Sequence, residues 1–251
     1  MIVHAVTFDC WGTLLVDSPA TDERYAGRRV AGFEKILNAS GIPVHRRELD
    51  RAYEASGRWL SRTWRKNQDV PASGHVRAIL EAVDAALPDR LAPQQMAALI
   101  RAYAIPALLV PPAMDEGARY ALETLAASGL TLGVVSNIMR TPGNVLRQIL
   151  DRSGLLAPVK VLTFSDECRI RKPNPEIFRL TLRQMGVAPE EAVHVGDDPI
   201  LDVEGARDAG MAVIQVTPDG RATAPVKPDA VIRGLRELPA ALDRLASTVD
   251  R

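Results

Sequence analysis

The side chains best suited to chemistry follow four stretches whose composition predicts buried strands. They provide a nucleophile, hydroxyls, an amide, an ammonium group and a cluster of carboxylates: Asp9, Thr13, Ser136, Asn137, Lys172, Asp197, Asp198 and Asp202. A carboxylate can form a covalent intermediate with its substrate, and a nearby cation can neutralise an anionic group while it is transferred. This combination indicates covalent catalysis by a carboxylate, with Asp9 as the nucleophile.

Several carboxylates that meet at one place repel one another unless a cation or a proton relieves them. Mg²⁺ is usually held by one or two carboxylates together with waters and substrate phosphate oxygens, a role that suits Asp9 and Asp197. Lys172 and Ser136 would then neutralise the transferring group and leave Asp9 free to attack in line. The residues therefore predict a magnesium-dependent hydrolase.

The elements that position these residues alternate between strand and helix from about residue 115 onward. The apolar and turn patterns predict strands at 2–9, 131–136, 160–164, 192–195, 212–216 and 230–232, and helices at 115–127, 142–153, 175–185, 201–209 and near the end of the chain. Such alternation predicts a Rossmann-like, doubly wound parallel sheet of the α/β class. Ligands of such sheets bind beyond the carboxyl ends of the strands, which is where the reactive residues lie.

Residues 21–109 break this alternation, because they show four helical segments and almost no strand pattern. The first strand is thereby separated from all the others. We expect residues 1–16 and 110–251 to form the α/β catalytic core and residues 17–109 to form an inserted helical cap.

Four sequence motifs resemble those of the haloacid dehalogenase (HAD) superfamily of hydrolases, most of which are phosphatases. They occur in the family's order: FDCWGTL from Phe8, VVSN ending at Asn137, Lys172 in RKPNPEIF, and HVGDDPILDVEGARDAGM from His194. The resemblance covers the chain end to end, including an inserted helical cap of the C1 type. It implies a cap that selects the substrate.

The resemblance also implies individual roles. Asp9 would be the nucleophile and a magnesium ligand, Asp197 a second ligand, and Trp11 a third through its backbone carbonyl. The remaining residues would hold the phosphoryl group or the nucleophile: Thr13, Ser136 and Lys172 as catalytic residues, and Trp11, Gly12 and Asn137 as substrate-binding residues.

Trp11 departs from the pattern of the family's phosphatases, which carry a second aspartate at this position. That aspartate protonates the leaving oxygen and then activates water, and such general acid–base groups contribute roughly 10²–10⁴ in rate. The family's haloacid dehalogenases also lack it, because halide leaves without a proton, so FDCWGTL favours a 2-haloacid dehalogenase that needs no metal. A catalytically silent protein that binds a ligand or partner is the third alternative.

The acidic fourth motif favours the phosphatase. As the resemblance has it, dehalogenases carry uncharged polar residues where this chain has Asp197 and Asp198. Uncompensated carboxylates would also repel a haloacid. We therefore expect first a Mg²⁺-dependent hydrolase of small-molecule phosphomonoesters, with a good leaving group or with an acid supplied by the cap or the substrate.

Composition limits the partners. The chain has 31 basic and 31 acidic residues, so its zero net charge disfavours nucleic acid and membrane surfaces and leaves a small anionic substrate. Only two cysteines are present, and no export signal is visible at the N-terminus, which predicts a cytoplasmic protein. The sequence leaves the substrate's identity and the oligomeric state open, a homodimer included.

Two further expectations concern single residues. Asp198 and Asp202 are interpreted either as site residues or as caps of the helix that follows them. Three arginines at helical spacing early in the cap, Arg24, Arg28 and Arg29, are expected to face water.

Overall fold

The computed structural model describes residues 2–16, 18–222 and 225–247, apart from the side chain of Pro19. The chain divides into two compact units. The core unit comprises residues 1–17, 113–137 and 150–251, and the helical unit comprises residues 18–112 and 138–149.

The core unit contains a six-stranded sheet in which every neighbouring pair is parallel, with the order β5-β4-β1-β6-β7-β8. The strands are β1 (Ala5–Phe8), β4 (Thr131–Ser136), β5 (Val159–Phe164), β6 (Ala192–Gly196), β7 (Ala212–Val216) and β8 (Ala230–Ile232). The α/β prediction is confirmed. Every residue of β1, β6 and β7 is buried, as expected of central parallel strands covered on both faces.

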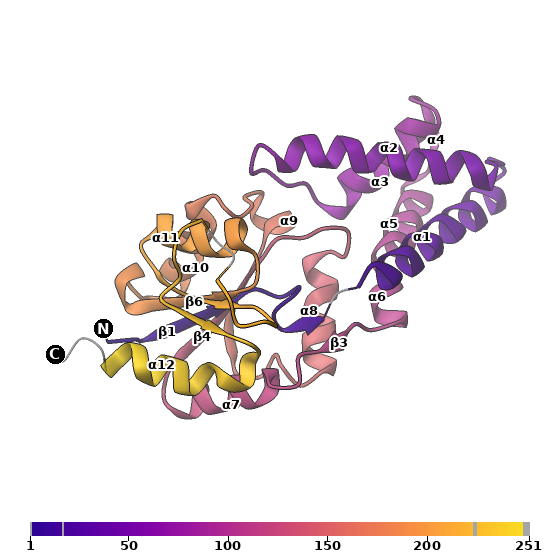
Figure 1. Cartoon of the computed structure of the whole chain (residues 1–251). Coiled ribbons are helices and arrows are strands. Elements are labelled where there is room, and N and C mark those ends of the chain that lie inside the picture. Colours follow the sequence, from indigo (N-terminus) through magenta and orange to yellow (C-terminus); the bar gives the residue numbers. More distant parts are fainter. Residues whose placement is uncertain (1, 17, 223–224, 248–251) are drawn as a thin grey trace. The chain divides into compact units, whose positions relative to one another are not determined.

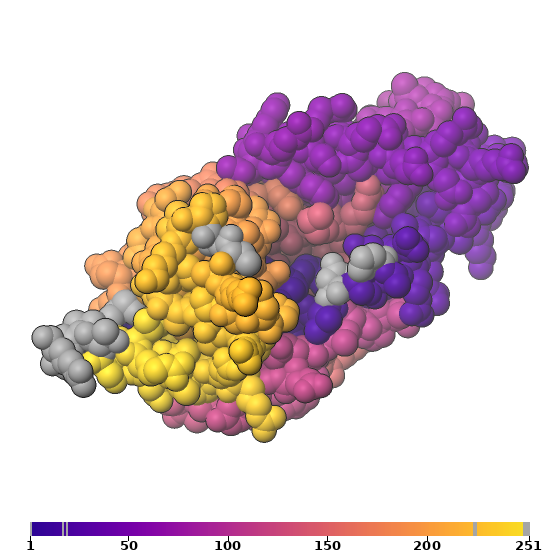
Figure 2. Space-filling model, in the orientation of Figure 1, coloured from indigo at the N-terminus to yellow at the C-terminus, as the bar shows by residue number. Residues whose placement is uncertain are grey.

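Helices lie on both faces of this sheet (Figure 1). On one face are α7 (Ala118–Ala127) and α12 (Leu238–Ser247), and on the other are α10 (Pro175–Met185) and α11 (Gly205–Ala209). Helix α10 presents Ile177, Phe178 and Leu182 to a buried apolar cluster shared with strand residues. Figure 2 shows α7 and α12 side by side at the surface of the core unit, in magenta and yellow.

The helical unit has four longer helices, as predicted: α1 (Pro19–Ala39), α2 (Arg46–Trp64), α3 (Ala72–Val83) and α5 (Pro93–Ala104). Two four-residue helices, α4 (Leu87–Arg90) and α6 (Pro106–Leu109), were not expected. The unit has its own apolar core, which includes Phe33, Leu49, Ile79 and Leu99. No helix in the described part of the chain is both long and apolar enough to cross a membrane.

Arg29 corrects one expectation, because it is 3% exposed rather than facing water. Its guanidinium donates hydrogen bonds to the carbonyl oxygens of Tyr103 and Arg140 and to the hydroxyls of Tyr53 and Thr141. Helical spacing places an arginine on a face of its own helix, whereas packing against other segments of the unit decides whether that face is covered. Arg24 and Arg28 are exposed, as expected.

Residues 138–149 belong to the helical unit, although the sequence analysis places them in the core. The side chain of Arg140 explains this, because it donates hydrogen bonds to Ser56 Oγ and to the Tyr53 carbonyl and stacks 4.0 Å over the Tyr53 ring. The segment contains most of α8 (Gly143–Arg152). The chain therefore passes between the two units directly after Asn137.

Two short strands were not predicted. β2 (Leu15–Val16) and β3 (Ala113–Met114) pair antiparallel. The helix expected at 201–209 is instead a π-helical turn over Pro199–Glu204 followed by α11. The side chain of Asp198 caps this turn by accepting hydrogen bonds from the Ile200 and Leu201 amides. Asp198 is thus a helix cap, one of its two expected roles.

Candidate active site

Asp9 lies at the carboxyl end of the central strand β1. Its amide donates a hydrogen bond to the carbonyl oxygen of Val195 on the neighbouring strand β6, at 2.9 Å, which extends the sheet pairing to this residue. Asp9 is 7% exposed. The sheet therefore fixes the backbone from which this carboxylate projects.

Lys172 joins two carboxylates at the base of the site. Its Nζ lies 2.6 Å from Asp9 Oδ1 and 2.5 Å from Asp202 Oδ1, and its side chain is 1% exposed. Burial by itself would lower the pKa of Lys172, but the carboxylates of Asp202 and Asp9 outweigh it and raise that pKa above its ordinary value. Lys172 is consequently a fixed positive charge beside Asp9.

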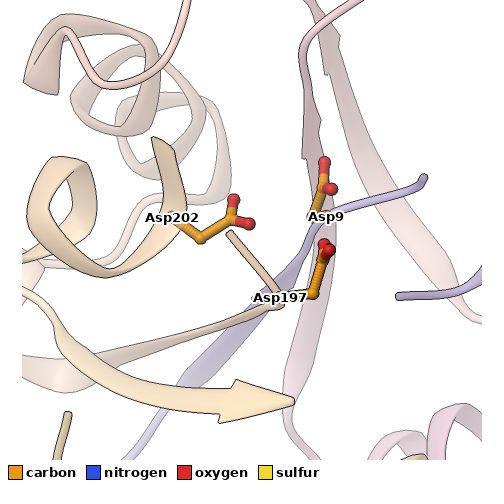
Figure 3. Close-up of side chains that lie close together, drawn as sticks. All are labelled: Asp9, Asp197 and Asp202. Atoms are coloured by element: carbon orange, nitrogen blue, oxygen red, sulfur yellow. The ribbon is translucent and has the colours of Figure 1, made fainter. Parts of the chain in front are cut away.

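Asp9, Asp197 and Asp202 bring carboxylate oxygens within 4.8 Å of one another (Figure 3). Burial, with added repulsion from Asp202 and Asp197 and despite the opposing effect of Lys172, raises the pKa of Asp9 to about 7. Burial and Asp202 raise the pKa of Asp197 to about 6. The two carboxylates hold their protons unusually tightly because burial disfavours their charged forms and Lys172 offsets this only in part.

Asp202 differs from the other two because its oxygens already have partners. Oδ1 accepts from Lys172 and lies 3.0 Å from His194 Nε2, and Oδ2 accepts from the Asp198 amide at 3.0 Å. Although burial acts to raise it, Lys172 and His194 hold the pKa of Asp202 below its usual range. Asp202 is therefore an anion that orients Lys172. The sequence left its role open between site residue and helix cap.

His194 belongs to the site although the sequence analysis did not include it among the site residues. Burial lowers its pKa, so the ring is neutral near pH 7 and its Nε2–H donates to the ionised Asp202. Nδ1 then accepts from the Thr7 hydroxyl, 2.9 Å away. A strand that ends beside Asp197 indicates that His194 lies near the site, but the sequence does not show its partners, because Thr7 and Asp202 lie 187 and 8 residues away along the chain.

Two glycines make room for the carboxylates. Gly12 has φ +81°, and a Cβ there would lie 2.5 Å from Asp197 Oδ2. A Cβ on Gly196 would lie 2.3 Å from Asp202 Cγ. Thr13 also faces this cluster, with its hydroxyl 3.4 Å from Asp197 Oδ1. Gly12 thus shapes the acidic cluster and allows the turn after β1.

Ser136 is the last residue of β4 and Asn137 follows it, and the two side chains differ in their hydrogen bonding. Ser136 is fully buried, and its Oγ has no hydrogen-bond partner within the residues that the structure describes. The amide of Asn137 makes both of its hydrogen bonds to the main chain of Lys172. Asn137 therefore supports Lys172, whereas the sequence analysis expects it to bind substrate, and Ser136 retains a free hydroxyl.

Position 11 carries a half-buried tryptophan, and its neighbour Cys10 is a buried free thiol. Burial raises the pKa of the Cys10 thiol, and the adjacent Asp9 raises it further, so the group is not a thiolate nucleophile. Trp11 takes part in an isolated bridge with Leu15 that closes the turn after β1. The Cys10 thiol is thus the only titratable side chain between Asp9 and Val16, and no carboxylate or imidazole lies there.

Comparison with known proteins places these observations in a family. Residues 3–210 match the family described as haloacid dehalogenase-like hydrolase, a class of hydrolases. This match includes Asp9, Ser136, Lys172 and Asp197. It also includes the whole helical insertion.

Several similar sequences are phosphatases by name, and others are named haloacid dehalogenase-like hydrolase domain-containing protein 3. A phosphoserine phosphatase of Thermus thermophilus is 39% identical over 44% of this chain and 43% of its own length. A phosphoglycolate phosphatase of Salmonella typhimurium is 28% identical over 96% of this chain and 92% of its own length. The alignments with the first of the curated relatives cover only about half of those proteins.

Similar solved structures include a dehalogenase and a phosphatase. A 2-haloacid dehalogenase from Pseudomonas syringae has a TM-score of 0.71 at 27% identity, covering 98% of this chain and all of the other. A phosphatase from Thermococcus onnurineus has a TM-score of 0.61 at 26% identity, covering 96% of this chain and 98% of the other.

Proposed function

The chain belongs to the haloacid dehalogenase-like hydrolases, and from this premise we propose that it hydrolyses small-molecule phosphomonoesters with Mg²⁺ through a phosphorylated Asp9. The observation that carries the proposal is the cluster of Asp9, Asp197 and Asp202 around Lys172. The carboxylates of the cluster are the kind of ligand that a hard cation such as Mg²⁺ prefers, and the Lys172 ammonium can bind an anionic substrate.

The acidic cluster fits Mg²⁺. Asp9 and Asp197 have raised pKa values because their charges are buried and incompletely compensated, and a bound cation would relieve both. Asp202 is committed to Lys172 and His194, so we assign the metal to Asp9 and Asp197, with the Trp11 carbonyl as a further ligand. Bound there, Mg²⁺ would offset charge on the phosphoryl oxygens.

The reaction then follows from the remaining residues. A carboxylate oxygen of Asp9 attacks phosphorus while the bond to the leaving oxygen breaks, and the released oxygen takes a proton. Water next attacks the aspartyl phosphate, inorganic phosphate leaves, and the Asp9 carboxylate is restored. Lys172 offsets charge throughout. The unpartnered hydroxyl of Ser136, together with the Thr13 hydroxyl beside Asp197, offers hydrogen bonds to phosphoryl oxygens.

Trp11 shapes the substrate range. An indole cannot donate a proton to a leaving oxygen, so the proton comes from solvent, from the helical unit or from the substrate itself. We therefore assign the protein to esters whose leaving groups are good or carry their own acid. The helical unit acts as the cap that selects among them, and a chain with only two cysteines suits the cytoplasm.

A 2-haloacid dehalogenase is the second candidate. It is favoured by Trp11 and by the likeness to the Pseudomonas syringae dehalogenase. In that reaction Asp9 would displace halide from carbon and form an ester, which water would hydrolyse. The partly buried Asp197 beside Asp9 disfavours it, because a carboxylate substrate would meet further negative charge.

One pair of assays tests both candidates. We would measure phosphate release from p-nitrophenyl phosphate with Mg²⁺ and with EDTA, beside halide release from 2-chloropropionate, using Asp9→Asn as the control. Phosphate release that requires Mg²⁺ and Asp9 is expected. Halide release that persists in EDTA would replace the phosphatase with a dehalogenase, and silence in both assays would favour a binding role.

A further inference from the structure

The chain from Arg58 to Lys66, at the end of α2, is strongly basic. In the first half of α2 three arginines are matched by three acids: Arg46, Arg47, Arg51, Glu48, Asp50 and Glu54. The second part has only cations: Arg58, Arg62, Arg65 and Lys66. The next acid, Asp69, is buried and accepts hydrogen bonds from the Trp64 indole and the Val70 amide. This acid therefore does not lie exposed beside the cations.

The basic segment lines a groove of about 420 Å³. We call it the α2 groove, and its walls are formed by Trp59, Arg62, Thr63, Arg65 and Lys66. Residues three and four positions apart share one face of a helix. The side chains on this face are Trp59, Arg62, Thr63 and Lys66. An aromatic surface thus lies next to hydrogen-bond donors and positive charges.

The cations of the α2 groove lack partners of opposite charge. Within the described ranges, no carboxylate forms an ion pair with Arg62, Arg65 or Lys66, and all three are exposed. Arg65 Nε donates to the Ser61 carbonyl, which leaves its other N–H groups available. Elsewhere in the unit exposed cations do pair, as Arg77 does with Glu81 and Asp89.

We propose that the α2 groove binds an oxyanion, a phosphate or carboxylate group of a small molecule, with Trp59 against its less polar part. Arginine forks and a lysine ammonium recognise such groups through charge-assisted hydrogen bonds. Seven helical residues span only about 10 Å, enough for one or two anionic groups but short for a nucleic-acid backbone. The neutral net charge of the chain agrees with a small ligand.

Two sources of this anion are consistent with the chemistry. It is either a second anionic group of the phosphomonoester substrate, an assignment that rests on the proposed function, or a separate anionic ligand.

The binding test uses inorganic pyrophosphate and calorimetry on the full chain in EDTA. We would compare the unaltered protein, Arg62→Gln/Lys66→Gln, and Arg51→Gln, an exposed arginine on the first half of the same helix. The double variant is expected to raise the dissociation constant at least about tenfold, with Arg51→Gln close to the unaltered protein. Equal affinity in all three proteins, or no binding to any, would overturn the proposal.

Kinetics with Mg²⁺ separate the two sources. If the groove holds the substrate, the double variant raises KM for phosphoglycolate at least about tenfold and leaves p-nitrophenyl phosphate hydrolysis unchanged. If KM is unchanged for both while pyrophosphate binding is lost, the groove takes a separate ligand. Failure of the unaltered protein to hydrolyse either ester would contradict the proposed function alone, because pyrophosphate binding is measured without turnover.

Discussion

The side-chain amide of Asn137 exchanges two hydrogen bonds with the main chain of Lys172. Its Nδ2 donates to the Lys172 carbonyl at 3.0 Å, and its Oδ1 accepts from the Lys172 amide at 2.8 Å. The carboxyl end of β4 thereby fixes the backbone of the residue whose ammonium contacts Asp9 and Asp202. Asn137 is the last core residue before the chain enters the helical unit.

We predict that Asn137→Ala lowers kcat by up to about 100-fold, because Lys172 shifts relative to Asp9. Two buried backbone groups lose their partner, so the free energy of unfolding should fall by about 1–3 kcal/mol. Steady-state kinetics and urea unfolding measure the two effects. Asn144→Ala, at an exposed position, is the control, and a variant with full activity would show that the amide does not position Lys172.

Lys172→Met should abolish activity and destabilise the protein by about 3–5 kcal/mol, because it leaves the Asp9 and Asp202 carboxylates buried without their cation. The loss of stability should be larger at pH 8 than at pH 5, since more carboxylate is ionised there. Thermal unfolding at both pH values tests this, with the exposed Lys160→Met as control. Equal losses at the two pH values would argue against buried charge as the cause.

Mg²⁺ binding should weaken as the pH falls. The pKa values of about 7 for Asp9 and about 6 for Asp197 mean that both carboxylates are ionised at pH 8 and increasingly protonated through pH 7 and 6. The ion must then displace between one and two protons near pH 6. Calorimetry in buffers of different ionisation enthalpy measures this release, and heats independent of the buffer would contradict it.

Gly12→Ala and Gly129→Ala form a matched pair, because both glycines have left-handed backbones, with φ +81° and +83°. Both substitutions should cost about 1–2 kcal/mol from backbone strain. Only at Gly12 would the new Cβ meet Asp197, since nothing lies within 4 Å of the corresponding atom at Gly129. Mg²⁺ affinity and activity should therefore fall in Gly12→Ala alone.

Trp11→Asp should supply the missing acid. Hydrolysis of an alkyl phosphate is expected to rise by about 10²–10⁴, while hydrolysis of p-nitrophenyl phosphate, whose leaving group needs no proton, changes little. Trp11→Asn, which cannot donate as an acid, is the control. A well-folded Trp11→Asp variant without this gain would show that a missing acid does not limit the rate.

The sequence by itself determined the α/β core and the part of the site that depends on it. Apolar runs that end in polar residues identified the strands, and parallel strands bring their carboxyl ends to one edge of a sheet. Asp9, Ser136, Lys172 and Asp197 could therefore be grouped without coordinates. The helical insertion was equally visible, because its pattern lacks strands.

Tertiary structure alone decided which polar groups pair. Asp198 and Asp202 lie one turn apart and look alike in sequence, but the π-helical turn makes the first a cap and directs the second to Lys172 and His194. The partner of Asn137 is 35 residues away, and Arg29 is buried by segments remote in sequence. The local sequence pattern determines which face of a strand or helix a side chain lies on. Its hydrogen-bond partners and its burial depend instead on which segments, distant in sequence, pack against that face.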